Sequence, residues 1–314
     1  MYVPIRTLVL GLLISCQLSC ASACTAFLIH QDENLFLCKN FDWDDGDGLV
    51  VYNPSGKQFY APETGTSWIA KYGSIKFCYK QASNIVGGMN EQGLVIEELS
   101  TLPFPIKKDH DKILLNEFQW IGYHLDNCAS VEEVVTSQQY INLVPEMHFL
   151  HYLISDAYGD AAILEFGPGG CVVYRGDELP YPVLSNNPYG SSLKYLAHFN
   201  GFGGKKTIPE SKASCDRFVI AAKQLQNITM NPGNCVDNCF EMLDKLKQHD
   251  TQWQIIYNIP DRQIYFRDNN SLFLHCINLD TFLLNNGTEG CCISLMGFSG
   301  SERLNELVKP QKPL

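Results

Sequence analysis

The chain has 314 residues, 45% of them hydrophobic, and a formal net charge of −11 at pH 7. This length is enough for one large domain with its own core, and no internal repeat, low-complexity tract or long linker divides it. The acidic balance excludes a protein that binds nucleic acid through a basic surface, because phosphate binding needs clustered lysines and arginines.

The first 23 residues have the pattern of a secretory signal peptide. Arg6 is their only charged residue, an apolar run follows at 7–14, and the small residues Ala21-Ser22-Ala23 end the segment. The run is too short to cross a bilayer as a helix, and no later stretch reaches the roughly 18 apolar residues of a membrane span. We therefore predict cleavage between Ala23 and Cys24, a secreted or periplasmic location without a membrane span, and one mature domain at 24–314 with a charge of −12 once Arg6 is removed.

Strands are expected at both ends of the mature chain, with helices between them. The first elements are two hairpins, one pairing 24–29 with 35–39 and the other pairing 84–89 with 94–99. The later strands are expected at 148–156, 161–166, 171–176, 252–258, 263–267 and 272–277. The helices are expected at 111–125, from a capping box at Ser130 to Glu133 onward, at 213–226 and at 235–247. This order predicts an α+β fold in which two antiparallel sheets pack face to face with helices outside.

Thirteen cysteines become eleven once Cys16 and Cys20 leave with the signal peptide. In an oxidising compartment an odd number sets one thiol apart, and the other ten are free to form up to five disulfide bonds. Zinc binding is a weaker interpretation, because no C-x-x-C pair occurs and the eight histidines are scattered. The cysteine set apart is Cys24, which cleavage would make the first residue.

Two interpretations of Cys24 compete. A lipid anchor is one, on Cys24 or on Cys16, where "LISC" is the better lipobox. A catalytic nucleophile is the other: a thiol reacts as the thiolate, and a free α-amino group with a pKa near 8 can take its proton without a histidine. Asn227, Asn269 and Asn286 lie in N-x-S/T sequons, which are glycosylated only in a eukaryotic secretory route.

Five segments in a fixed order carry a resemblance to a known family. They are "CTAFLIHQDENLFLCKNFDW" at 24–43, "GGMNEQGL" at 87–94, "SNNP" at 185–188, "SCDRFV" at 214–219 and "DTQWQIIYNIPDRQIYFR" at 250–267. Together they resemble the choloylglycine hydrolases and penicillin V acylases, which are N-terminal-nucleophile hydrolases with an αββα sandwich. The resemblance implies hydrolysis of a linear C–N amide through a thioester, a small-molecule amide substrate, no cofactor and no metal, and a dimer or tetramer.

The resemblance also implies roles for individual residues. Cys24 would attack the amide carbon with its own α-amino group as proton shuttle, and Asp42 would hold that group through a charge-assisted hydrogen bond. Arg217 would favour the thiolate electrostatically. Asn186, rather than Asn187, would donate to the oxyanion of the tetrahedral intermediate.

Two positions depart from the family pattern. Lys39 stands where the family has arginine, so a flexible point charge replaces a planar fork, and Ser100 stands where it has asparagine or tyrosine. Ser100 and Asn90 are the expected substrate-binding residues, and the Ser100 backbone N–H is a second oxyanion donor. Because of Lys39 we expect a penicillin-like or fatty acyl amide to be preferred over a conjugated bile salt.

Two alternatives belong to other classes. The acidic loop at 42–48 is like a calcium loop in composition, but it lacks the glutamate at position 12 of an EF-hand. A non-catalytic, disulfide-rich binding protein that keeps this fold is the alternative to an enzyme.

Overall fold

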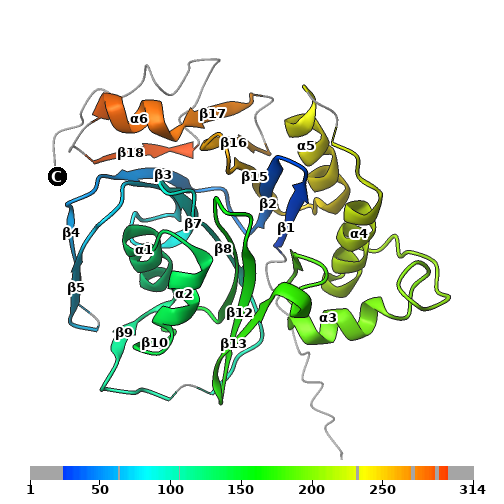
Figure 1. The fold of residues 1–314 in the computed structure, drawn as a ribbon, viewed down its shortest axis with the longest axis horizontal. Helices are drawn as coiled ribbons and strands as arrows, with labels where there is room; N and C mark the ends of the chain where they lie inside the picture. The colour runs from blue at the N-terminus through cyan, green and yellow to red at the C-terminus, as the bar shows by residue number, and fades with distance from the viewer. Residues whose placement is uncertain are drawn as a thin grey trace, which may run out of the picture.

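The computed structural model describes residues 24–295, apart from 63, 106, 231–232, 270–272, 287–289 and the side chains of 283–286. The predicted signal peptide, with Cys16 and Cys20, lies outside the described residues. Two antiparallel sheets stack against each other, and helices cover their outer faces (Figure 1). The predicted αββα arrangement is confirmed.

The first sheet has six strands and carries the start of the described chain. In order across the sheet they are β14 (Val183–Leu184), β1 (Thr25–Gln31), β2 (Asn34–Asp42), β15 (Thr251–Asn258), β16 (Gln263–Asp268) and β17 (His275–Asn278). Helices α4 (Ser214–Asn227) and α5 (Cys235–Leu246) cover its outer face. Both faces of β1 and β2 are therefore buried, which explains their nearly continuous apolar sequences.

The second sheet has eight strands and curves around a second group of helices (Figure 1). Its strands are β13 (Gly170–Arg175), β12 (Ala161–Gly167), β11 (Leu150–Ser155), β8 (Val95–Ser100), β7 (Ile85–Asn90), β6 (Ser74–Tyr79), β3 (Gly48–Asn53) and β18 (Cys291–Ser294). Helices α1 (Glu117–Asn127) and α2 (Val131–Ser137) pack on its outer face around Trp120 and form a second core there.

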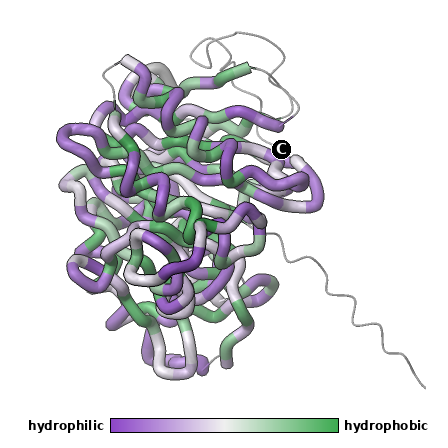
Figure 2. The backbone as a smooth tube through the Cα atoms, turned by 90° about the vertical axis from the view of Figure 1, so that its right-hand side faces the viewer, coloured by the Kyte–Doolittle hydropathy of each residue, from purple (hydrophilic) through white to green (hydrophobic). Residues whose placement is uncertain are grey.

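Short elements complete the described chain. They are the hairpin of β4 (Gln58–Ala61) and β5 (Thr66–Ile69), the parallel pair β9 (Ile113–Leu115) and β10 (Ile141–Leu143), the 3₁₀ turn η1 (Gly176–Glu178), and helices α3 (Tyr189–Leu196) and α6 (Leu279–Asn286). Hydrophobic segments run through the interior, and hydrophilic ones form many of the outer turns (Figure 2). No helix in the described part of the chain is long and apolar enough to cross a membrane.

Most predicted strands and helices are confirmed, but the helix expected at 111–125 starts too early. Residues 113–115 pair in parallel with β10, and the helix begins after Asn116. The Asn116 side chain accepts hydrogen bonds from the N–H groups of Phe118 and Gln119, and Gln119 completes the capping box. At the next helix, Ser130 caps the Glu133 N–H as predicted, whereas the Glu133 carboxylate accepts from Ala129 and not from Ser130.

The eleven cysteines of the described chain are all free thiols. The predicted disulfide bonds are therefore absent from the structure. Of the three sequon asparagines, Asn227 and Asn269 are exposed, and the side chain of Asn286 is not among the described ones.

Candidate active site

Cys24 lies immediately before β1 and is 1% exposed. The β1–β2 hairpin determines its surroundings, because Thr25 pairs with Asn40 and the turn at Asp32 has the positive φ of 54° that a tight hairpin loop needs. This register brings the backbone of Asp42 beside the thiol. The Asp42 N–H lies 3.5 Å from the Cys24 Sγ, and the thiol lies 3.7 Å from the Asp42 carbonyl oxygen.

The guanidinium of Arg217 joins helix α4 to this strand. Its Nε donates to the Thr25 Oγ1 at 2.8 Å, and its Nη2 donates to the Cys24 carbonyl at 3.1 Å. The same Nη2 donates to the Asn186 Oδ1 at 2.8 Å, and Nη1 donates to the Lys212 carbonyl at 2.7 Å. A buried arginine with four acceptors fixes the relative positions of Cys24, helix α4 and Asn186.

Asn186, and not Asn187, is the asparagine that joins this network. With its Oδ1 held by Arg217, the Asn186 amide donates through Nδ2 to the Ser100 carbonyl at 2.8 Å. The Asn187 N–H instead donates to the Ser214 Oγ at 3.1 Å. The structure thus brings Cys24, Arg217, Asn186 and Ser100 together, from segments as far apart as β1, β8 and α4.

The Asp42 carboxylate is buried among polar groups of the last helix–strand connection. It accepts hydrogen bonds from the Thr251 Oγ1 at 2.5 Å and the Gln248 Nε2 at 3.3 Å. Burial raises the pKa of Asp42 to about 6, although these two donors and the charge of Arg217 act in the opposite direction. A cationic neighbour would therefore stabilise the ionised form of this carboxylate.

Lys39 is fully buried between the two sheets and bonds to the second one. Its Nζ lies 2.8 Å from the Glu97 carboxylate and 3.1 Å from that of Glu98, and it donates to the Val86 carbonyl at 3.0 Å. Burial lowers the pKa of Lys39, but the two glutamates outweigh it and the net shift is upward. The lysine is thus held in one geometry, contrary to the flexible point charge expected from sequence.

Burial also governs the ionisation of Cys24 and Glu97. It raises the pKa of the Cys24 thiol well above its ordinary value, with Lys39 as the main opposing charge. It raises the pKa of Glu97 as well, against the charge of Lys39 and a hydrogen bond from the Tyr257 hydroxyl. The protonated thiol is therefore the favoured form of Cys24 in this environment.

A small aromatic cavity of about 20 Å³ has Ser100 and Glu98 of this site in its lining. Its lining comprises Phe41, Trp43, Tyr79, Val86, Glu98, Ser100, Phe118, His148 and Leu150. Trp43 packs edge-on against His148 and stacks on Phe41, which in turn stacks on the buried Trp253. Trp253 thus packs in the core, and Trp43 belongs to the wall of this cavity.

The structure does not bring Asn90 to the other candidate residues. It is fully buried, and its Nδ2 donates to the carbonyls of Leu125 and Cys128 at the end of α1. Its Oδ1 accepts from the N–H groups of Gln92 and Leu94. Asn90 therefore holds the β7–β8 turn against α1, which is a structural task. The acidic loop likewise has local partners, since Asp45 accepts from the Tyr79 hydroxyl and pairs with Lys80.

Four residues of the site were not predicted. Thr251 and Gln248 bond to Asp42, and Glu97 and Glu98 bond to Lys39. Two adjacent glutamates inside the apolar strand "VIEELS" were a signal that could have been used, because a buried carboxylate needs a charged or hydrogen-bonding partner.

Comparison with known proteins places this geometry in a family. The model of the linear amide C–N hydrolases, choloylglycine hydrolase family, matches residues 24–238. A penicillin V acylase of Pectobacterium atrosepticum is 28% identical over 232 residues, covering 67% of this chain and 61% of that protein. A bile salt hydrolase/transferase of Lactiplantibacillus plantarum is 27% identical over 195 residues, covering 51% and 58%. The chain thus spans about three fifths of the length of these relatives.

Solved structures agree with the match. The penicillin V acylase of Agrobacterium tumefaciens has a TM-score of 0.72 and 25% identity, covering 82% of this chain and 86% of that one. A variant of the conjugated bile acid hydrolase of Clostridium perfringens has a TM-score of 0.73 at 16% identity, covering 86% and 96%, and shares the fold. The chain belongs to the choloylglycine hydrolase family of enzymes that hydrolyse linear amide C–N bonds.

Proposed function

We propose that this protein is an exported amidohydrolase whose nucleophile is Cys24, freed as an N-terminal residue by cleavage after Ala23. The observation that carries the proposal is the buried network in which Arg217 binds the Cys24 carbonyl, Thr25 and Asn186. The leader pattern and the start of the family match at residue 24 support the cleavage.

The free α-amino group of Cys24 supplies the base that the buried thiol requires. It accepts the thiol proton as Sγ attacks the amide carbon, and the Asp42 carboxylate stabilises the resulting ammonium. The C–N bond then breaks, and the ammonium returns the proton to the leaving amine. The acyl group remains on Sγ as a thioester, which water hydrolyses to the carboxylic acid, again with the amine as base.

The tetrahedral intermediates carry their negative charge on the former carbonyl oxygen. Asn186 is oriented to donate to it because Arg217 holds the amide oxygen and thereby directs Nδ2 to the opposite side, where Ser100 lies. The Ser100 backbone N–H is the second proposed donor. One such donor lowers the activation free energy by about 3 kcal/mol.

The wall beside the nucleophile favours an apolar acyl group. Its aromatic side chains suit an aryl or alkyl chain. Lys39 is already paired with two carboxylates, so it is not available to bind an anionic group of a substrate. We therefore place penicillin V and N-acyl amides above conjugated bile salts as substrates. The family match favours an enzyme over a non-catalytic binding protein of the same fold. The dimer or tetramer stays a prediction.

The test combines mass analysis with a substrate comparison. The exported protein should start at Cys24 with an unmodified amine, and it should hydrolyse penicillin V or an N-acyl amide with a kcat/KM at least tenfold above that for glycocholate or taurocholate. Cys24→Ala is the inactive control. An acylated or extended N-terminus on active protein would contradict the amine mechanism, and a tenfold preference for a conjugated bile salt would reverse the substrate order.

A further inference from the structure

The cavity lined by Ser100 and Glu98 is too small for the acyl group that the proposed reaction requires. Its volume is about 20 Å³, close to the roughly 10–15 Å³ that a single water molecule needs. Ligand pockets usually have volumes of roughly 300–1,000 Å³. An acyl group that reaches the nucleophile must therefore extend beyond this cavity.

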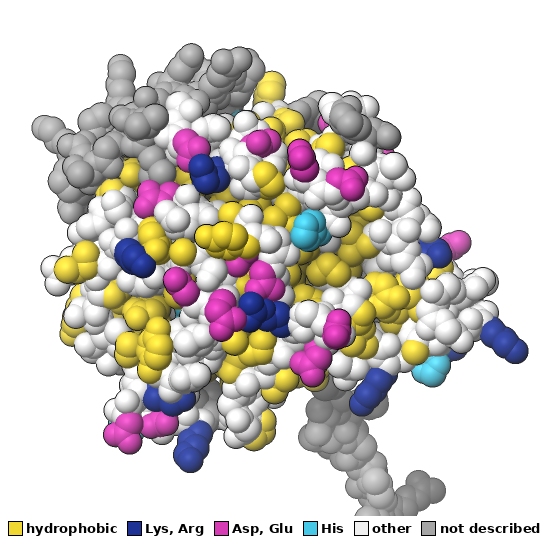
Figure 3. Space-filling view, viewed as in Figure 1, with side chains coloured by type: hydrophobic (Ala, Val, Ile, Leu, Met, Phe, Trp, Pro, Cys, Tyr) yellow, Lys and Arg dark blue, Asp and Glu magenta, His cyan; other side chains and the backbone are white. Residues whose placement is uncertain are grey.

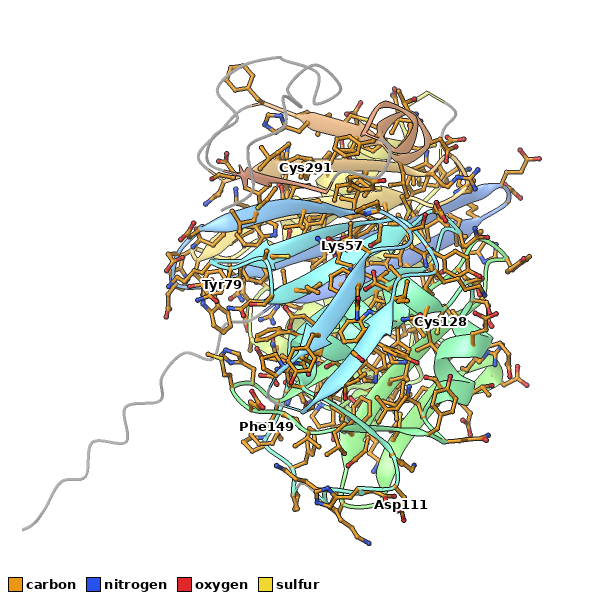
Figure 4. The ribbon with its side chains drawn as sticks, turned by 90° about the vertical axis from the view of Figure 1, so that its left-hand side faces the viewer. Lys57, Tyr79, Asp111, Cys128, Phe149 and Cys291 are labelled. Carbon is orange, nitrogen blue, oxygen red and sulfur yellow. The ribbon has the colours of Figure 1, made fainter. Side chains whose placement is uncertain are left out.

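A cavity of about 620 Å³ lies next to it, on the outer face of the second sheet. The β4–β5 hairpin, the β6–β7 turn and the start of α1 form its walls, with apolar contributions from Val51, Phe59, Trp68 and Ile85. Figure 4 labels Tyr79 of the small cavity and Lys57 of the large one. The volume is in the range of a complete ligand site.

The lysines of the large cavity do not exclude an apolar occupant. Lys76 pairs with Asp126 at 2.6 Å, and Lys57 donates to the Asn53 Oδ1 at 2.8 Å. Both ammonium groups also lie near the face of Phe59, at 4.9 and 5.3 Å from the ring centre. Each cation thus has a partner that does not depend on the ligand. On the face of the molecule drawn in Figure 3, hydrophobic side chains are interspersed with acidic and basic ones.

Phe118 is the one residue common to the two linings among those described. At β7 the two cavities lie on opposite faces of the second sheet, because Ile85 lines the large one from the outer core and Val86 lines the small one from the core between the sheets. The Phe118 backbone is held by the Asn116 cap at 3.1 Å, whereas its ring makes an edge contact with the ring of His148, 6.0 Å away. Rotation of this side chain is therefore a smaller change than movement of the helix end.

We propose that Phe118 separates the catalytic cavity from an acyl-chain site in the 620 Å³ cavity, and that it turns aside to admit a long acyl group. The preferred substrates are then amides of long, flexible acyl chains, with the carbonyl at Cys24 and the distal methylenes against Phe59 and Trp68. This inference rests on the proposed amidase function and specifies its acyl group.

The test uses the p-nitroanilides of butanoic, octanoic and dodecanoic acid with the mature protein. Each methylene that becomes buried raises kcat/KM about three- to fourfold, so the dodecanoyl substrate should exceed the butanoyl substrate by tenfold or more even after the cost of moving Phe118. Ala61→Phe and Ser83→Trp, both in the lining of the large cavity, should reduce this dodecanoyl-to-butanoyl ratio at least tenfold. Phe118→Ala should raise it.

Val172→Trp is the matched control, because Val172 is exposed on β13 and belongs to neither lining. An unchanged ratio in both folded cavity variants would overturn the acyl-chain site. Calorimetric titration of dodecanoate into Cys24→Ala gives a readout that does not need turnover. We expect at least tenfold weaker binding when Ala61→Phe is added and no change with Val172→Trp; equal binding in all three would reject the proposal. Hydrolysis of none of the anilides, with dodecanoate binding as expected, would instead reject the proposed amidase function.

Discussion

Replacement of Asp42 by asparagine should stabilise the uncleaved chain at neutral pH. The wild-type carboxyl is fully buried, and burial raises its pKa from 3.8 to about 6. Between these values the folded chain keeps a proton that the unfolded chain has released, so the free energy of unfolding falls as pH rises. The difference of about two units corresponds to roughly 3 kcal/mol above pH 6, at 1.36 kcal/mol per unit.

Asparagine avoids this cost because it does not ionise. Its Oδ1 can still accept from Thr251, while the contact with Gln248 requires that amide to turn, which removes up to about 1 kcal/mol of the gain. We expect Asp42→Asn to raise the free energy of unfolding by about 2 kcal/mol at pH 8 and to leave it nearly unchanged at pH 4.

Urea denaturation of the chain that retains the residues before Cys24, at several pH values from 4 to 8, measures this difference. A constant difference between Asp42→Asn and wild type over that range would refute the argued pKa. The mature chain provides a second comparison, because its free ammonium would stabilise the ionised carboxylate. The gain from Asp42→Asn should therefore shrink or change sign after maturation, and an equal gain in both forms would argue against contact between Asp42 and the amine.

Five further changes test the site. Cys24→Ala should abolish turnover. Retention of Ala23 should slow turnover at least a hundredfold, because an amide nitrogen is not a base. For both proteins kcat is measured from time courses of product release. Asn186→Ala should lower the acylation rate by about a hundredfold or more with little change in substrate binding, whereas Asn187→Ala should stay within threefold; the reverse result would show that the assignment at "SNNP" is shifted by one residue. Lys39→Met should lower the free energy of unfolding by about 3–5 kcal/mol, because two buried glutamates lose their cation; a loss below 1 kcal/mol in urea denaturation at pH 7 would contradict the buried ion cluster.

The sequence was most informative where one hairpin determines the geometry. Cys24 and Asp42 are joined by β1 and β2, whose pairing follows from the two-residue turn at Asp32 and Glu33, so their proximity is a local property. The contact between Arg217 and Asn186 is different. It depends on how α4 packs against the first sheet, and the family resemblance indicated both residues but not their contact.

The sequence was least informative where two sheets or two cavities meet. The partners of Lys39 come from β8, in the other sheet, and no periodicity in either strand specifies which residues face each other across the interface. The position of Phe118 depends on where α1 starts. The apolar residues 113–115 fit a helical period as well as a strand, and their pairing with β10 decided between the two.

The buried ion cluster of Lys39, Glu97 and Glu98 joins the two sheets. Taking an ammonium and two carboxylates out of water costs several kcal/mol per ion, so the cluster is a poor source of stability compared with apolar packing. What it provides is position: Lys39 on β2 bonds to Glu98 and to the Val86 carbonyl, and both residues line the small aromatic cavity. The first sheet, which begins after Cys24, is thereby held to the second sheet, which carries the proposed acyl wall. A change at Lys39 should consequently move the wall relative to the thiol and alter acyl preference even where folding survives.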